Sequence, residues 1–150
     1  MTKPYVSEMT SPHARRARES KVADGLDHGI DSAFVDVMVD RFYDRIQQDE
    51  LLGPVFARHI DAWPPHLAHM KRFWRSVLFS TGEFRGNPMM KHLMIQGLTA
   101  EMFAHWLSLF RETLLEIGDE NAAELVHSRA RMIAGSFMAA IQAQNLSQRD

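Results

Sequence analysis

The segment Gly86-Asn87-Pro88-Met89-Met90-Lys91-His92-Leu93 decides how the rest of this chain is interpreted. Gly86 and Asn87 form a break, and Pro88 suits the first turn of a new helix. His92 then stands about one turn into that helix. Because loops are expected on both sides, the segment predicts a short helix that presents one histidine.

Long amphipathic helices are predicted on either side of this segment. Pro64-Pro65 starts a helix that stops near Ser80-Thr81-Gly82, and Thr99 caps a helix that ends at Gly118 in a left-handed cap. The predicted inward residues are Leu67, Met70, Phe73, Trp74, Val77 and Leu78 before the segment, and Met102, Phe103, Trp106, Leu107, Phe110, Leu114 and Ile117 after it.

Two further helices are predicted, one earlier in the chain and one later. Asp31 caps a helix whose apolar stripe contains Tyr43, and the segment Asp49–Pro54 ends it, with Val55 and Phe56 in the turn. Asp119 or Asn121 opens the last helix. Its predicted inward residues are Leu125, Val126, Met132, Ile133, Phe137, Met138 and Ile141. No strand pattern competes, so the chain is predicted to be all-α, with four longer helices and one short one.

The ends of the chain are less apolar than its middle. We expect residues 1–30 to form an N-terminal arm that is mobile or contains a short helix near Ala14–Ala23, with Arg15-Arg16-Ala17-Arg18 as a solvated patch. Residues 31–142 are expected to form the folded domain. Residues 143–150 are expected to form a polar, fraying C-terminal tail.

Composition narrows the classes of function. A chain of 150 residues suits one domain, and a net charge of -2 gives no electrostatic case for nucleic-acid binding. With no cysteine, thiolate metal sites and disulfides are excluded, so the 8 histidines are prominent candidate ligands. No segment reaches the roughly 18 apolar residues of a membrane span. Since Met1–Thr10 also lacks the apolar centre of a secretory signal, we expect a cytoplasmic protein without a membrane partner.

The sequence gives little support for a catalytic histidine base, a zinc site or a di-iron site. No nucleophile motif accompanies a histidine base. His66 and His69 have zinc-ligand spacing but no evident third ligand, and Glu124 with His127 forms one Glu-x-x-His where a di-iron bundle needs two. Surface placement was expected for that last pair.

Haem accounts for more of the pattern, because it needs one axial ligand, a flat apolar slot and a polar group on the far side. His92 can present Nε2 to iron, and Tyr43, His66 and Trp106 are polar-tipped residues on apolar helix faces. The candidate slot residues are Phe56, Met70, Phe73, Trp74, Met89, Leu93, Phe103 and Ile133. A helical interaction or regulatory domain without haem, whose aromatics only fill the core, remains the alternative.

An ordered set of residues carries a family resemblance over about residues 31–142. The set comprises Phe42-Tyr43, Leu52-Gly53-Pro54-Val55-Phe56, His66 with Phe73-Trp74, Gly86-Asn87-Pro88 with His92, and Phe103-Ala104-His105-Trp106-Leu107. In this order and spacing, the chain resembles the third group of truncated haemoglobins.

The resemblance implies a globin-like, truncated two-over-two helical sandwich around haem b. In it, His92 matches the proximal iron ligand, Phe56 the phenylalanine on the porphyrin face, and Trp74 a bulky aromatic residue deeper in the helix that carries His66. Tyr43 and Trp106 match the distal hydrogen-bonding pair, and His66 the distal histidine. We also expect Lys91, Arg72 and His69 to be propionate partners.

The resemblance further implies O₂, NO or CO as ligands, and an unidentified reductase as partner. A pocket with two polar donors favours redox chemistry, such as NO dioxygenase-like or peroxidase-like activity, over oxygen transport. The family assigns no role to the N-terminal arm.

Overall fold

A computed structural model describes residues 11–148 of the chain. Within this range there are seven helices and no strand, so the all-α prediction is confirmed. The helices are α2 (Pro12–Asp27), α3 (Ser32–Gln48), α4 (Gly53–His59), α5 (Trp63–Phe79), α6 (Pro88–Leu93), α7 (Ala100–Ile117) and α8 (Glu120–Gln148).

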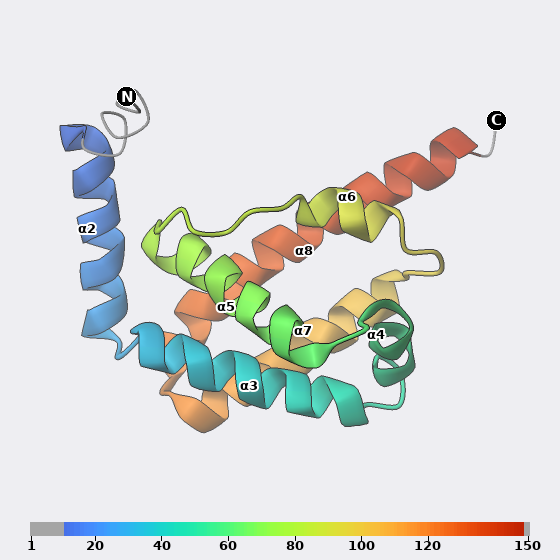
Figure 1. The fold of residues 1–150 in the computed structure, drawn as a ribbon, viewed down its shortest axis with the longest axis horizontal. Helices are drawn as coiled ribbons and strands as arrows, with labels where there is room; N and C mark the ends of the chain where they lie inside the picture. Colours follow the sequence, from blue (N-terminus) through green and yellow to red (C-terminus); the bar gives the residue numbers. More distant parts are fainter. Residues whose placement is uncertain (1–10, 149–150) are drawn as a thin grey trace.

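Two packed pairs of helices form the body of the molecule. Helix α3 packs against α5 and α7 against α8, and α3 also packs against α7, which joins the two pairs (Figure 1). The short α6 lies against α8, and α2 lies against α5 at one side. The fully buried residues between the pairs include Val35, Met38, Val39, Phe42, Ile46, Phe110, Leu114 and Val126. This is the expected two-over-two helical sandwich.

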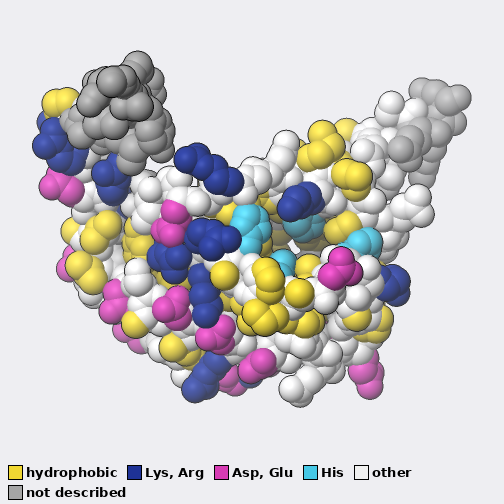
Figure 2. Space-filling model, in the orientation of Figure 1, with side chains coloured by type: hydrophobic (Ala, Val, Ile, Leu, Met, Phe, Trp, Pro, Cys, Tyr) yellow, Lys and Arg dark blue, Asp and Glu magenta, His cyan; other side chains and the backbone are white. Residues whose placement is uncertain are grey.

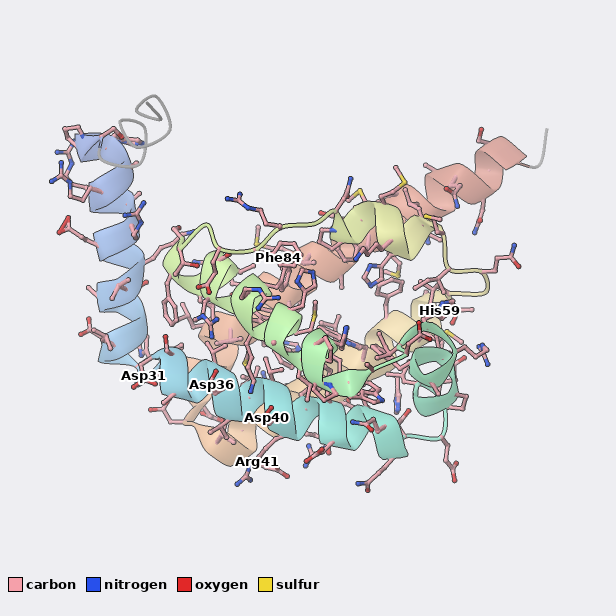
Figure 3. All side chains as sticks on the ribbon, viewed as in Figure 1. Asp31, Asp36, Asp40, Arg41, His59 and Phe84 are labelled. Atoms are coloured by element: carbon pink, nitrogen blue, oxygen red, sulfur yellow. The ribbon has the colours of Figure 1, made fainter. Side chains whose placement is uncertain are left out.

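Four side chains set where the long and short helices begin. Asp31, Asn87, Thr99 and Asp119 each accept a hydrogen bond from the backbone N–H three residues later, at 2.8–3.1 Å. Each bond satisfies an N–H group that the first helical turn leaves without a partner. Asp36 and Asp40, labelled in Figure 3, lie on α3 and pair with Arg75 and Lys71 of α5.

Two expectations about helix ends were wrong. Gly53 and Pro54 were expected only to end α3. They are instead the first residues of a further helix, α4, which carries Phe56, because proline is favoured in the first turn of a helix. Gly118 has an extended backbone with φ of -151° instead of a left-handed cap, because Asp119 starts the next helix at once.

Helix α8 differs from its prediction in length and in one inward residue. It continues to Gln148, through most of the expected polar tail, and Gln144 Nε2 donates to the Leu93 carbonyl at 3.0 Å. Met132 was predicted to face inward, but its side chain is 67% exposed.

The described part of the arm is a docked helix. Helix α2 is longer than the expected segment, and Ser11 caps its start. Arg18 Nε and Lys21 Nζ donate to the carbonyls of Ser80 and Val77 at the end of α5. Residues 1–10 of the arm and 149–150 of the tail lie outside the described residues. Among the helices described, none has the length and apolarity needed to cross a membrane.

Candidate functional site

One large cavity lies among α3, α4, α5, α6, α7 and α8, with a volume of about 400 Å³. Figure 2 shows histidine side chains gathered around a hollow between α5 and α6, with Lys and Arg side chains beside it. Most of the predicted site residues line this cavity. They are Tyr43, Phe56, His66, Met70, Phe73, Trp74, Lys91, His92, Phe103, Trp106 and Ile133. Met89 and Leu93 are half-buried and do not line it.

His92 is held by its own short helix. Its Nδ1–H donates to the Pro88 carbonyl at 2.7 Å, since a carbonyl oxygen can only accept. Nε2 therefore keeps its lone pair and is free to bind a metal ion. The ring also packs on Phe137 of α8, with centroids 4.6 Å apart. Burial lowers the pKa of His92, while the Pro88 bond partly opposes this shift, so the imidazole is neutral at pH 7.

Tyr43 lies at the centre of an aromatic cluster on another part of the wall. Its ring centroid is 5.3 Å from that of His66 and 5.9 Å from that of Phe56. Trp106 joins this cluster through Phe42, whose ring is 5.1 Å from each of Tyr43 and Trp106. Residues from α3, α4, α5 and α7 thus meet at one polar-tipped surface of the cavity.

The polar atoms of this cluster have few protein partners. Burial raises the pKa of Tyr43, so its hydroxyl stays a neutral donor. Within residues 11–148 that hydroxyl makes no hydrogen bond and is not sealed off by other atoms. His66 Nε2, by contrast, is buried with no partner in the same range. Because an unpaired buried polar atom costs about 1–3 kcal/mol, its retention is itself a sign of a binding site.

Basic side chains gather at one edge of the cavity. Burial, and then the charges of His69 and Lys91, lower the pKa of His66 to about 4. Burial, Lys91 and Arg72 in turn lower the pKa of His69. His69 and Lys91 line the cavity, whereas Arg72, also on α5, does not line it but acts on His69 through its charge. This edge can bind an anionic group.

Several lining residues were not predicted. Phe137, one turn beyond Ile133 on α8, was predicted to face inward but not to line the slot. Phe84 lies in a loop without periodicity, and its ring is 4.5 Å from that of His69. Phe84 and His59, labelled in Figure 3, both line the cavity and lie on different sides of it in that view. A loop residue such as Phe84 gives no local signal, whereas His59 ends a helix, α4, that was not predicted.

The alternative metal site around Glu124 and His127 has another explanation. Glu124 is exposed, but the expectation of a surface position was wrong for His127, which is 7% exposed against α7. Its Nε2–H donates to the Leu107 carbonyl and its Nδ1 accepts from Arg131, which also pairs with Glu124. Within the described residues, no three His, Asp or Glu side chains are grouped to hold a metal ion.

The chain is similar to a curated protein and to a solved structure. No protein-family model matches the chain. The group 3 truncated hemoglobin ctb of Campylobacter jejuni is 34% identical over 104 residues, which span 67% of this chain and 82% of that protein. A crystal structure of group III truncated hemoglobin from Campylobacter jejuni superposes with a TM-score of 0.72 at 31% identity. That superposition covers 75% of this chain and 91% of the other.

Proposed function

Because this chain belongs to the group III truncated haemoglobins, we propose that it binds haem b in the cavity, with His92 as the axial iron ligand, and binds O₂ and other diatomic molecules there. The observation that carries the proposal is the state of His92. Its Nδ1–H is committed to the Pro88 carbonyl, which leaves Nε2 as a lone-pair donor in an otherwise apolar cavity.

The volume and the lining of the cavity fit a large aromatic cofactor. Protein interiors are close-packed, with few voids larger than one water molecule. A domain whose aromatics only fill the core would therefore not leave a space of about 400 Å³. The walls offer Phe56, Phe73 and Phe137 for contact with the macrocycle, and Lys91 and His69 for its carboxylates, with the charge of Arg72 close enough to act on His69.

His92 is positioned from two sides. The bond to Pro88 fixes the tautomer, orients the ring and makes Nε2 a stronger donor. Contact with Phe137 fixes the ring against rotation, since α6 packs on α8. The protein thus holds a neutral imidazole ready before any metal arrives.

Tyr43 and Trp106 supply two donors to the same cavity. Haem, when bound, supplies reversible binding of diatomic ligands and one-electron redox chemistry. The Tyr43 hydroxyl and the Trp106 indole N–H can donate to a ligand that carries negative charge, and in a site without bulk water these bonds are stronger than in solution. His66, with its unpaired Nε2, adds a third polar group.

Two hydrogen-bond donors directed at one bound diatomic ligand slow the release of that ligand. We therefore propose redox or detoxification chemistry, such as NO oxidation or reaction with peroxide, and not oxygen transport as the role of this pocket. Such turnover requires an electron-donating reductase.

The test is an absorption spectrum of the haem-reconstituted protein. We expect an intense Soret band that shifts when CO is added after reduction. His92→Ala is expected to lose tight haem retention, and His92→Gly to regain it when imidazole is supplied. His59→Ala, which removes another cavity histidine, serves as the control and is expected to keep the band. A folded chain that stays colourless with excess haem would disprove the proposal.

A further inference from the structure

Oxidisable aromatic side chains connect the cavity wall to the outside of the protein. Trp63, at the start of α5, lies 5.9 Å from Tyr43 and 6.5 Å from Phe56 between ring centroids, and its plane is within 21° of the Phe56 ring. Tyr43 and Phe56 line the cavity, whereas Trp63 does not. Trp63 thus stands in a second layer, directly behind the wall.

Trp63 differs from the other oxidisable rings in its surroundings. Trp74 is 3% exposed and Tyr43 is 5% exposed, and both line the cavity together with Trp106. Trp63 is half-buried. Among residues 11–148, it is the tryptophan or tyrosine that touches the wall from behind and also reaches the surface.

Loss of an electron from these rings is coupled to loss of a proton. The Trp63 indole N–H has no acceptor among residues 11–148 and is not sealed from solvent, so its proton can leave to water. The Tyr43 side chain is only 5% exposed, and the His66 imidazole lies edge-on to its ring at 5.3 Å between centroids. An oxidised Tyr43 therefore keeps its proton close by and can be reduced again by Trp63.

We propose that Trp63 is a surface oxidation site, at which the haem-loaded protein, after reaction with a hydroperoxide, oxidises phenols and aromatic amines that are too large for the cavity. This inference rests on the proposed haem function. Electrons pass one at a time from Trp63 to Tyr43, over ring separations short enough for rapid hopping.

The electrons and atoms balance when two donor molecules are oxidised, each by one electron. Each donor AH gives Trp63 one electron and releases one proton, becoming A•, while the hydroperoxide takes up two electrons and two protons and its O–O bond breaks. The sum is ROOH + 2 AH → ROH + H₂O + 2 A•. No metal, oxidant or reductant beyond the haem, the hydroperoxide and the donor is needed.

The test locates the oxidised side chain directly. Haem-loaded protein is mixed with hydrogen peroxide and a nitroso spin trap without any donor, and the adduct is located by peptide mass spectrometry. We expect the adduct on Trp63. Trp63→Phe keeps the ring contacts but cannot be oxidised, and should lose both the adduct at this position and the turnover of a bulky phenolic dye.

Trp63→Tyr provides the matched control, because it restores an oxidisable ring at the same place. We expect it to regain the adduct, on the substituted side chain, and to regain dye turnover. An adduct confined to Tyr43 or Trp106 in the wild type, or dye turnover unchanged in Trp63→Phe, would overturn the inference while leaving the haem function intact. A chain without a Soret band would overturn both, and the spectrum separates the two failures.

Discussion

One backbone carbonyl determines the chemistry of His92. Without the 2.7 Å bond to Pro88, either ring nitrogen could carry the proton. With it, Nε2 is the free donor. The acceptor lies four residues earlier in the same helix, so the arrangement is local and depends on α6 being formed.

Replacement of Tyr43 by phenylalanine tests the distal donors. A hydrogen bond to a charged acceptor contributes about 1.5–3 kcal/mol, so Tyr43→Phe should speed O₂ release roughly tenfold or more. Stopped-flow measurement of O₂ dissociation gives the rate. Trp106→Phe should act in the same direction, and unchanged release in both variants would show that neither side chain is a distal donor.

His66 predicts how the stability of the haem-free protein depends on pH. Its pKa is about 4 in the folded chain and 6.5 for an unperturbed histidine, because burial opposes its charge. The unfolded chain therefore binds more protons between these values, and the free energy of unfolding should fall as pH falls from 6.5 toward 4. Burial lowers the pKa of His92 and His127 as well, so they act in the same direction.

Urea unfolding between pH 7 and pH 4 measures this dependence. The glutamine in His66→Gln cannot take up a proton. The free energy of unfolding of this variant should therefore depend less steeply on pH than that of the wild type. The difference in slope corresponds to about one bound proton at most. An equal slope in the two proteins would show that His66 is charged to the same extent in both states.

Among the elements, α6 is the one most dependent on its flanking contacts. A helix of 6 residues has little stability of its own, and this one is held by the Asn87 cap, by packing on α8 and by the bond from Gln144 to Leu93. Its position, and hence that of His92, is set by these contacts.

Loss of the Asn87 cap should therefore affect cofactor retention as well as stability. Asn87→Ala removes the 3.1 Å bond from the Met90 N–H and should cost about 0.5–2 kcal/mol, with faster haem loss. Thr99→Ala removes the equivalent cap of α7 and should cost a similar amount with a smaller effect on haem loss. Haem transfer to apomyoglobin and urea unfolding measure the two effects, and equal haem loss in both variants would contradict the role given to α6.

At the scale of the whole molecule, α2 is joined to the sandwich by close packing at Gly25. A Cβ there would lie 2.9 Å from the Ile30 carbonyl oxygen and 3.2 Å from the Phe79 ring. Arg18 and Lys21 add bonds to the carbonyls at the end of α5. Helix α2 is therefore packed closely against the end of α5 and the residues that precede α3.

Gly25→Ala should destabilise the protein by about 1–3 kcal/mol, because the backbone of Ile30 cannot move away freely. Gly135 is the matched control. It lies mid-helix on the exposed side of α8 with no atom within 4 Å of the added Cβ, so Gly135→Ala should stabilise by about 0.5–1 kcal/mol. Urea unfolding measures both, and a neutral Gly25→Ala would show that α2 is only loosely packed.

The sequence by itself determined where most helices begin and which residue types surround the cavity. Asp31, Asn87 and Thr99 cap their helices through bonds to residues three positions away, and periodic apolar faces place Tyr43, Trp74 and Trp106 inward. These features depend on hydrogen bonds between residues close in the chain and on helical spacing, so they can be predicted from the sequence.

Only the tertiary structure decided which of these residues meet. It placed Phe84 on the cavity from an aperiodic loop, left Met89 and Leu93 off its wall, buried His127 against α7 and set Trp63 behind Tyr43. Such contacts join residues far apart in the chain, and they depend on the packing of whole helices. Local pattern carries no information about that packing, which is the physical reason the sequence could name His92 but not the loop residue Phe84 on the same cavity.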